Sequence, residues 1–224
     1  INNLCLSGGV AANIIMSLNI YERTSFKNIY VLPPMADDGL AIGSAILTAI
    51  DLGEDVSWLK DYVMPYFGDS FTREEVKKAL DSFDNITYED IKNDWPQEAA
   101  ISVSKGKICA LFQGKMEFGP RALGNRSILT SPFPKEMKDI LNSRVKFREE
   151  FRPFAPAILY EFTQEYFDIQ QESPHMLITA QVKPDKVDEI PAVVHVDNSA
   201  RVQTVKSENN DRFRKLIEAF HKIT

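Results

Sequence analysis

The sequence predicts an α/β segment followed by a longer α+β segment. Residues 3–53 alternate strand-like and helix-like runs in the order βαβα, which is typical of a layered α/β domain. From residue 71 onward, short strand-like runs dominate. Seven of the ten glycines gather in three short stretches near predicted strand ends, and such clusters mark candidate ligand sites. We therefore divide the chain into residues 1–70 and 71–224.

The first segment opens with a short apolar strand over residues 3–6. Apolar residues at helical spacing then predict a helix over residues 11–18. A second strand, residues 28–32, ends at two prolines. Residues 40–52 are apolar almost all round, which predicts a buried helix, and Gly53 is placed to end it.

The second segment follows a predicted surface linker over residues 54–70, which has scattered aromatics and no hydrophobic period. Thr72 and Glu75 have the spacing of a capping box, so a helix begins there. Further strands are predicted at residues 107–112, 127–130, 156–160, 176–182 and 192–196, and further helices at residues 134–142 and 209–222.

Composition and charge exclude several classes of function. No apolar run reaches the ~18 residues that a membrane span needs, so we expect no membrane association. The two cysteines and three histidines lack zinc-site spacing, and we expect Cys5 and Cys109 to be buried, reduced thiols of a cytoplasmic protein. The net charge of -6 argues against general nucleic-acid binding.

Positive charge is concentrated in one stretch of this acidic chain. Residues 115–152 contain nine Lys or Arg and five Asp or Glu. Such an island suits a small anionic ligand better than a long polyanion.

Two candidate sites lie in the first segment. Gly8 and Gly9 turn the chain between a strand and a helix, where free N–H groups can bind phosphate; a tight turn without a ligand is the alternative. Asp37 and Asp38 stand at the start of the next helix, where they could hold a divalent ion or simply cap the helix.

Two more candidates lie in the basic stretch. Arg121 and Arg126 occupy a glycine-rich loop and can grip phosphate or carboxylate; a solvated loop is the alternative. In an extended chain Arg144, Lys146 and Arg148 share one face, which favours an anion between them. Their interleaved aromatics would also fit single-stranded nucleic acid, and a solvated edge strand is the simplest interpretation.

The last candidate is a group of polar residues in a strand-forming run. His195, Asp197 and Arg201 lie within seven residues of each other. A histidine in this setting is more often structural than catalytic.

Together these segments resemble the O-carbamoyltransferase family of nodulation and antibiotic-tailoring enzymes. Residues 6–13, Leu-Ser-Gly-Gly-Val-Ala-Ala-Asn, and residues 33–43, Pro-Pro-x-x-Asp-Asp-Gly-Leu-Ala-Ile-Gly, are similar to its N-terminal domain. Residues 112–127, 146–156 and 195–205 are similar to its C-terminal domain. The most specific stretch is Gly-Pro-Arg-Ala-Leu-Gly-Asn-Arg-Ser.

The resemblance implies a fold and a reaction. Residues 1–70 would be the end of an actin/hexokinase-like ATPase domain, and residues 71–224 an incomplete YrdC-like α+β domain. The implied enzyme makes carbamoyl-adenylate from ATP and carbamoyl phosphate. It then passes the carbamoyl group to a hydroxyl of a small natural product or sugar.

The resemblance also assigns roles to residues. Gly8, Gly9 and Asn13 match the nucleotide-binding turn, and Asp37 matches a ligand of a divalent metal ion, iron or magnesium. Lys146 and Arg148 match a Lys-x-Arg element that holds phosphates. With the other candidates, the set expected to bind carbamoyl phosphate and ATP is Lys115, Arg121, Arg126, Lys146, Arg148, His195 and Arg201.

Two alternatives stay open from the sequence. One is a non-catalytic module that binds nucleotide or RNA, and the other is a carbamoyltransferase similar to hydrogenase-maturation proteins. Since the family's metal-binding histidines and its Ser-x-Asn element have no match here, we expect a fragment that alone is inactive.

Overall fold

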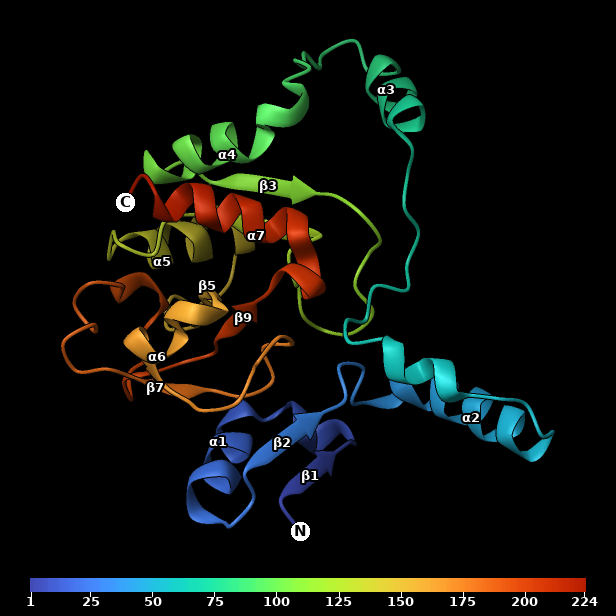
Figure 1. Cartoon of the computed structure of the whole chain (residues 1–224). Coiled ribbons are helices and arrows are strands. Elements are labelled where there is room, and N and C mark those ends of the chain that lie inside the picture. Colours follow the sequence, from blue (N-terminus) through green and yellow to red (C-terminus); the bar gives the residue numbers. More distant parts are fainter.

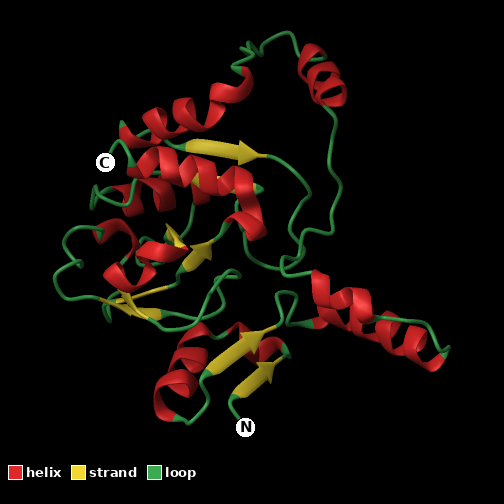
Figure 2. Ribbon diagram, viewed as in Figure 1, coloured by secondary structure: helices red, strands yellow, loops and turns green.

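The computed structural model describes residues 1–224, except for the side chain of Asn93. The molecule mixes helices with four small sheets of two or three strands (Figures 1 and 2). This confirms the predicted mixture of α and β structure. None of the described helices is long and apolar enough to cross a membrane.

The first segment contains a parallel pair of strands, β1 (Asn3–Leu6) and β2 (Asn28–Val31). Helix α1 (Ile14–Arg23) connects them, after a short 3-10 turn. These elements confirm the predicted strand, helix, strand order. Cys5 is exposed and Cys109 is only half-buried, so the prediction of buried thiols is wrong for Cys5 and only partly met by Cys109. Both cysteines are free.

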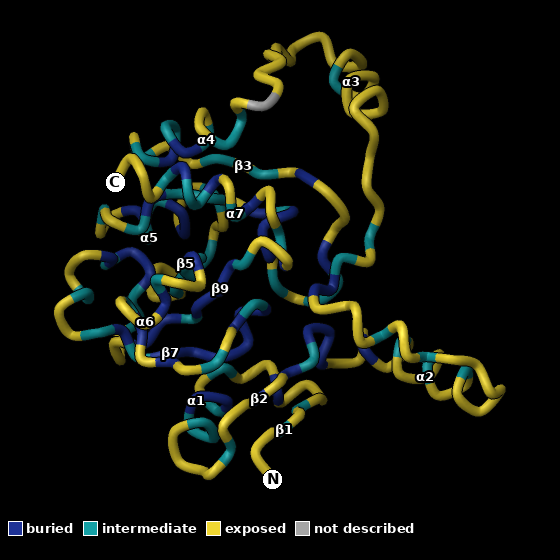
Figure 3. The backbone as a smooth tube through the Cα atoms, viewed as in Figure 1, coloured by how far each residue is buried: buried dark blue, intermediate teal, exposed yellow. Residues whose placement is uncertain are grey.

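Helix α2 (Asp37–Asp51) forms where a helix is predicted, but it is not buried. It extends away from the body of the molecule, and most of its surface is exposed (Figures 1 and 3). Leu47 is 64% exposed, and Gly39 is the one residue of the helix that is buried. The predicted burial is wrong because only part of the helix surface is covered, and the apolar side chains of Leu40, Leu47 and Ile50 stay exposed. Gly53 ends the helix as predicted, with a φ of 79°.

The chain then runs through the predicted linker to α3 (Arg73–Asp81), whose capping box between Thr72 and Glu75 is confirmed. Helix α4 (Trp95–Ser104) has no counterpart among the predicted elements. It packs against the closing helix α7 (Ser207–His221) at one side of the body (Figure 1).

Three small sheets make up the rest of the second segment. Strand β3 (Cys109–Phe112) pairs antiparallel with β4 (Arg126–Leu129), and β5 (Ala157–Leu159) pairs parallel with β9 (Gln203–Val205). The third sheet has the antiparallel order β6 (Phe167–Asp168), β7 (Ala180–Val182), β8 (Ser199–Ala200). Two short helices, α5 (Met137–Leu141) and α6 (Thr163–Tyr166), lie between these strands.

The strand predicted at residues 192–196 is wrong. Pro191–Val193 forms a 3-10 turn instead. The proline at its first position fixes a helix-like φ and offers no N–H to a sheet. The third strand of the β6–β7–β8 sheet is instead formed by Ser199–Ala200, a few residues further along the chain.

The main hydrophobic core joins the two segments. Ile29 and Val31 of β2, and Met35 after it, are buried in the same cluster as residues from the β6–β7–β8 sheet. The contributions from the second segment include Phe167, Ile169, Leu177, Ala180, Val182 and Val202. The amide of Gln171 also spans to β2, where it accepts from the N–H of Ile29 at 2.7 Å and donates to its carbonyl at 3.0 Å. The first segment is therefore held directly on the second.

Helix α7 contains a break near its start that shapes a nearby surface. Asn210 is extended, with φ -164° and ψ 86°, and its side chain accepts from the N–H of Phe213 at 3.0 Å. This is the geometry of a helix N-cap, so the continuous part of α7 begins after Asn210.

Gly124 gives a test of this packing. It has a φ of 100°, and a Cβ there would lie 2.5 Å from the buried ring of Phe213. We expect Gly124→Ala to lower the free energy of unfolding by about 2 kcal/mol or more, because backbone strain and overpacking act together. Urea denaturation measures this.

The matched control is Gly43→Ala on exposed α2, where a Cβ would meet nothing within 4 Å. This change should be neutral or stabilising by up to ~1 kcal/mol, since alanine favours helix. Equal stability of the two variants would contradict the contact between Gly124 and α7.

Candidate functional site

The glycine-rich loop, residues 113–126, is held in shape by one buried carboxylate. Oε1 of Glu117 accepts from the backbone N–H groups of Leu123 and Asn125 at 2.8 Å each and of Arg126 at 3.1 Å. Glu117 is only 9% exposed. Hydrogen bonds to a charged acceptor are stronger than those to a neutral one, so Glu117 is the main constraint on the loop.

The loop touches the first segment at Gly119. A Cβ at this glycine, whose φ is 122°, would lie 3.0 Å from the carbonyl oxygen of Pro33. Two residues further on, the Met35 carbonyl accepts from the N–H of Gly8 at 2.7 Å. The predicted nucleotide turn, the start of α2 and the glycine-rich loop are therefore neighbours in space.

Three arginines, Arg121, Arg148 and Arg152, lie close enough to Arg201 for their charges to affect it, and we call the four residues the arginine cluster. Burial first, and then the charges of these three neighbours, lower the pKa of Arg201 to about 10. Burial also lowers the pKa of Arg121. Four like charges at one place favour an anion between them.

Asn142 fixes the position of Arg148 in this cluster. The Asn142 side chain is fully buried, and its Oδ1 accepts from Nε of Arg148 at 2.7 Å. Its Nδ2 donates to the carbonyls of Glu150 and Arg152 at 3.1 and 2.9 Å. The Arg148 guanidinium also lies over the Phe154 ring, 4.7 Å from its centroid.

The predicted shared face of Arg144, Lys146 and Arg148 is wrong. Asn142–Lys146 forms a π-helical turn, and Phe147 follows in the left-handed region with a φ of 47°. This backbone rotates the three side chains away from the alternation of an extended chain. Lys146 is exposed, whereas Arg148 is partly buried in the arginine cluster.

The cluster contains polar groups that nothing in the described chain satisfies. Three buried nitrogen atoms in and beside the cluster have no hydrogen-bond partner among the described residues: Nε of Arg121, Nε of Arg201 and Nε2 of His195. Among the described residues, one carboxylate lies within 4 Å of a guanidinium group of the cluster. It belongs to Glu149, 3.7 Å from Arg152. Buried charge without a counter-ion is costly, so a bound anion would stabilise this arrangement.

Hydrogen bonding sets the tautomer of His195. Burial raises the pKa of Asp197, but hydrogen bonds from Ser199 outweigh it and lower that pKa overall, so Asp197 only accepts. The Ser199 hydroxyl donates to Asp197 at 2.7 Å, and its oxygen must therefore accept from Nδ1 of His195 at 3.1 Å. Burial lowers the pKa of His195, so the ring is neutral and its free Nε2 is an acceptor.

Two predicted cations serve other purposes or lie elsewhere. Arg126 donates to the carbonyls of Asn125 and Gly114 at 3.1 and 3.2 Å, and stacks 3.7 Å from the Phe112 ring centroid, so it braces the loop. Lys115 is exposed and lines a separate small cavity beside α7.

The comparison with known proteins decides the family. Residues 100–224 match the model of the carbamoyltransferase C-terminus, and residues 1–46 match that of the carbamoyltransferase N-terminus. The chain belongs to the carbamoyltransferase family.

Relatives of this carbamoyltransferase chain come from archaea and bacteria. It is 48% identical over 227 residues to an uncharacterized protein of Methanocaldococcus jannaschii, covering 100% of this chain and 37% of the relative. It is 37% identical to nodulation protein NolO of Bradyrhizobium diazoefficiens, covering 99% and 41%. It is 34% identical to nodulation protein U of Rhizobium tropici, covering 99% and 36%. The chain thus spans about two fifths of these relatives.

The residues that were predicted to bind nucleotide and a metal ion lie at exposed turns of this carbamoyltransferase chain. Gly8, with a φ of 97°, and Gly9 are exposed, with open space where a Cβ would be. Asn13 is engaged as the N-cap of α1, accepting from Met16 at 3.1 Å. Asp37 is exposed, and the described residues contain no group of three metal-binding side chains. The chain's own residues therefore do not assemble a metal site.

Three residues that shape the site were not predicted from the sequence: Glu117, Asn142 and Arg152. Glu117 could have been suspected as the one acidic residue inside a glycine-rich loop. Arg152 stands beside the matched Lys-x-Arg element, in the same basic stretch. Asn142 carries no signal in the sequence, because its role depends on the π-helical turn.

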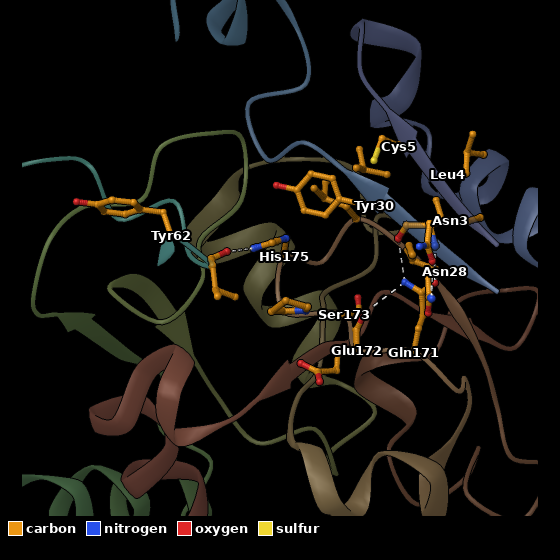
Figure 4. A pocket seen from close by; sticks show the side chains of 16 residues that line it. Asn3, Leu4, Cys5, Asn28, Tyr30, Tyr62, Gln171, Glu172, Ser173 and His175 are labelled. Atoms are coloured by element: carbon orange, nitrogen blue, oxygen red, sulfur yellow. Dashed lines mark hydrogen bonds between the residues drawn. The ribbon is translucent and has the colours of Figure 1, made fainter. Parts of the chain in front are cut away.

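Another cavity lies apart from all of these residues. It has a volume of about 510 Å³ and lies between β1, β2 and residues 171–178 (Figure 4). Nε2 of His175 there donates to the Val63 carbonyl at 2.7 Å, and its ring meets Tyr30 edge-on. No residue predicted to bind a ligand lines this cavity.

His175 gives a test of stability against pH. Burial lowers its pKa, so protons bind the unfolded chain first as pH falls below the ordinary value of ~6.5. The stability from the neutral ring is therefore present above that pH and is lost below it. When the pH is lowered from about 7.5 to about 5.5, the free energy of unfolding should fall less in His175→Gln than in the parent. Urea denaturation at each pH measures this. An identical pH slope would contradict a buried neutral His175.

Proposed function

We propose that the chain forms part of an enzyme that uses ATP and carbamoyl phosphate to carbamoylate a hydroxyl group. The observation that carries this is the arginine cluster: four arginines with one carboxylate within 4 Å among the described residues, two of which, Arg121 and Arg201, have a buried Nε without a partner. Guanidinium groups bind phosphate oxygens in pairs of hydrogen bonds. Membership of the carbamoyltransferase family makes carbamoyl phosphate the best candidate for that anion.

His195 supports a ligand that carries an amide as well as a phosphate. Its free Nε2 is an acceptor, and its ring lies close enough to Arg201 for that charge to lower its pKa. A carbamoyl NH₂ group is a donor, whereas the methyl group of acetyl phosphate is not. We propose that His195 accepts this hydrogen bond while the arginine cluster holds the phosphate.

The proposed reaction has two stages. In the second segment, proposed to be YrdC-like, water hydrolyses carbamoyl phosphate to carbamate and phosphate. A carbamate oxygen then attacks the α-phosphorus of ATP, so that carbamoyl-adenylate forms and pyrophosphate leaves. In the first segment, proposed to be ATPase-like, the open turn at Gly8 and Gly9 holds the nucleotide. The acceptor hydroxyl oxygen then attacks the carbamoyl carbon, loses its proton, and AMP leaves. A divalent metal at Asp37 would need further ligands, so we derive no step through it.

The acceptor is proposed to be a hydroxyl of a small natural product or sugar, modified in the cytoplasm. Relatives named as nodulation proteins are consistent with a role in biosynthesis. A nucleic-acid-binding module is disfavoured, because the net charge is -6 and the cations of the cluster are gathered at one point.

Carbamoyl phosphate binding tests this proposal. By calorimetry, Arg121→Gln should bind carbamoyl phosphate roughly tenfold or more weakly than the parent, because a charge-assisted hydrogen bond is lost. Lys135→Gln, an exposed cation of the same stretch outside the cluster, is the matched control and should bind normally. His195→Ala should lose its preference for carbamoyl over acetyl phosphate.

Equal affinity of Arg121→Gln and Lys135→Gln would show that the cluster does not hold the ligand. If binding follows the cluster but ATP yields no pyrophosphate in the presence of carbamoyl phosphate and the intact parent enzyme, the site is correct and the proposed adenylate step is wrong.

A further inference from the structure

A second, smaller cavity lies between the glycine-rich loop and the start of α7. It has a volume of about 270 Å³. Its lining comprises Tyr66, Gln113, Gly114, Lys115, Asn125, Asn209, Asn210 and Arg212. None of these residues belongs to the arginine cluster. Eight polar or small residues without a single carboxylate form a lining suited to a polar, anionic ligand.

The cavity is rigidly built on one side. Nδ2 of Asn210 donates to the Tyr66 hydroxyl at 3.0 Å and to Oδ1 of Asn125 at 2.9 Å. Nδ2 of Asn125 in turn donates to the Lys115 carbonyl at 2.7 Å. These bonds join the loop, the linker and α7, so the cavity wall does not depend on a ligand to form.

Two side chains of the lining keep unused hydrogen-bonding capacity. Gln113 and Asn209 are each 8% exposed. Oε1 of Gln113 and Nδ2 of Asn209 have no partner among the described residues. Buried polar atoms normally have partners, and those without one mark places where a further group is missing.

Three features attract negative charge to this cavity. Lys115 and Arg212 are exposed and have no carboxylate within 4 Å in the described chain. The continuous part of α7 begins at the cavity, since Asn210 is its N-cap. The first N–H groups of a helix and its dipole favour an anion.

We propose that this cavity binds the phosphate group of a small phosphorylated molecule, separately from the arginine cluster. The phosphate lies against Lys115, Arg212 and the start of α7, and the polar remainder of the ligand reaches Gln113 and Asn209. The site does not rest on carbamoyl transfer, because it shares no residue with the cluster.

Phosphate titration followed by NMR tests the proposal. Inorganic phosphate and AMP are added separately to the ¹⁵N-labelled chain, and the signals of Gly114 and of the Gln113 and Asn209 side-chain amides are followed. We expect these signals to shift with saturation. Tighter binding of AMP would support contacts beyond the phosphate, and equal affinity would support a site for the phosphate group alone.

Matched variants separate this cavity from other cations. Lys115→Gln/Arg212→Gln should weaken phosphate binding at these signals roughly fivefold or more, because two charge-assisted contacts are lost. Lys60→Gln/Lys222→Gln removes two exposed cations elsewhere and should leave affinity unchanged. Arg121→Gln should also leave these signals unchanged, even if it abolishes carbamoyl phosphate binding.

Two outcomes would overturn the proposal. The first is that phosphate shifts signals only around Arg201, which would place all anion binding in the arginine cluster. The second is that the Lys115→Gln/Arg212→Gln variant binds phosphate as the parent does, which would leave only ordered water as the partner of Gln113 and Asn209.

Discussion

The carboxylate of Glu117 is the interaction on which the rest of the site depends. It gathers three backbone N–H groups of the glycine-rich loop onto one oxygen. The loop shape that results sends Gly119 against Pro33 and Gly124 against Phe213. It also carries Arg121 to the arginine cluster on one side and Lys115 to the small cavity on another. A single buried charge thus organises contacts with both the first segment and the closing helix.

A second constraint is the repulsion within the arginine cluster. Packing and hydrogen bonds hold these cations together without matching carboxylates, as when Asn142 fixes Arg148. Such a site stores unfavourable electrostatic energy that an anion would relieve on binding, which is the physical basis of the phosphate binding proposed for it. The neutral His195 beside it adds an acceptor, on which the proposed discrimination between carbamoyl and acetyl phosphate rests.

Local sequence signals were sufficient for much of the fold. Signals that depend on a few neighbouring residues predicted their structures correctly. Those confirmed are the capping box at Thr72, the strands around residues 3–6 and 28–32, and the helix end at Gly53. The exposure of α2 could not be predicted, because an apolar pattern shows what a helix can bury and not whether a partner is present. Of the seven residues predicted to bind carbamoyl phosphate and ATP, Arg121, Arg148 and His195 lie close to Arg201. The other three, Lys115, Arg126 and Lys146, are not part of this group. The π-helical turn that orients Arg148 depends on Asn142, whose side chain donates to two backbone carbonyls that carry no sequence signal.

The dependence of the loop on Glu117 is tested most directly by amide hydrogen exchange in Glu117→Ala, with the exposed Glu136→Ala as control. In Glu117→Ala the amides of Leu123, Asn125 and Arg126 should exchange roughly tenfold faster or more, since each loses a charge-assisted hydrogen bond. In Glu136→Ala they should exchange as in the parent. Unchanged exchange at all three amides in Glu117→Ala would show that the loop keeps its shape without this carboxylate.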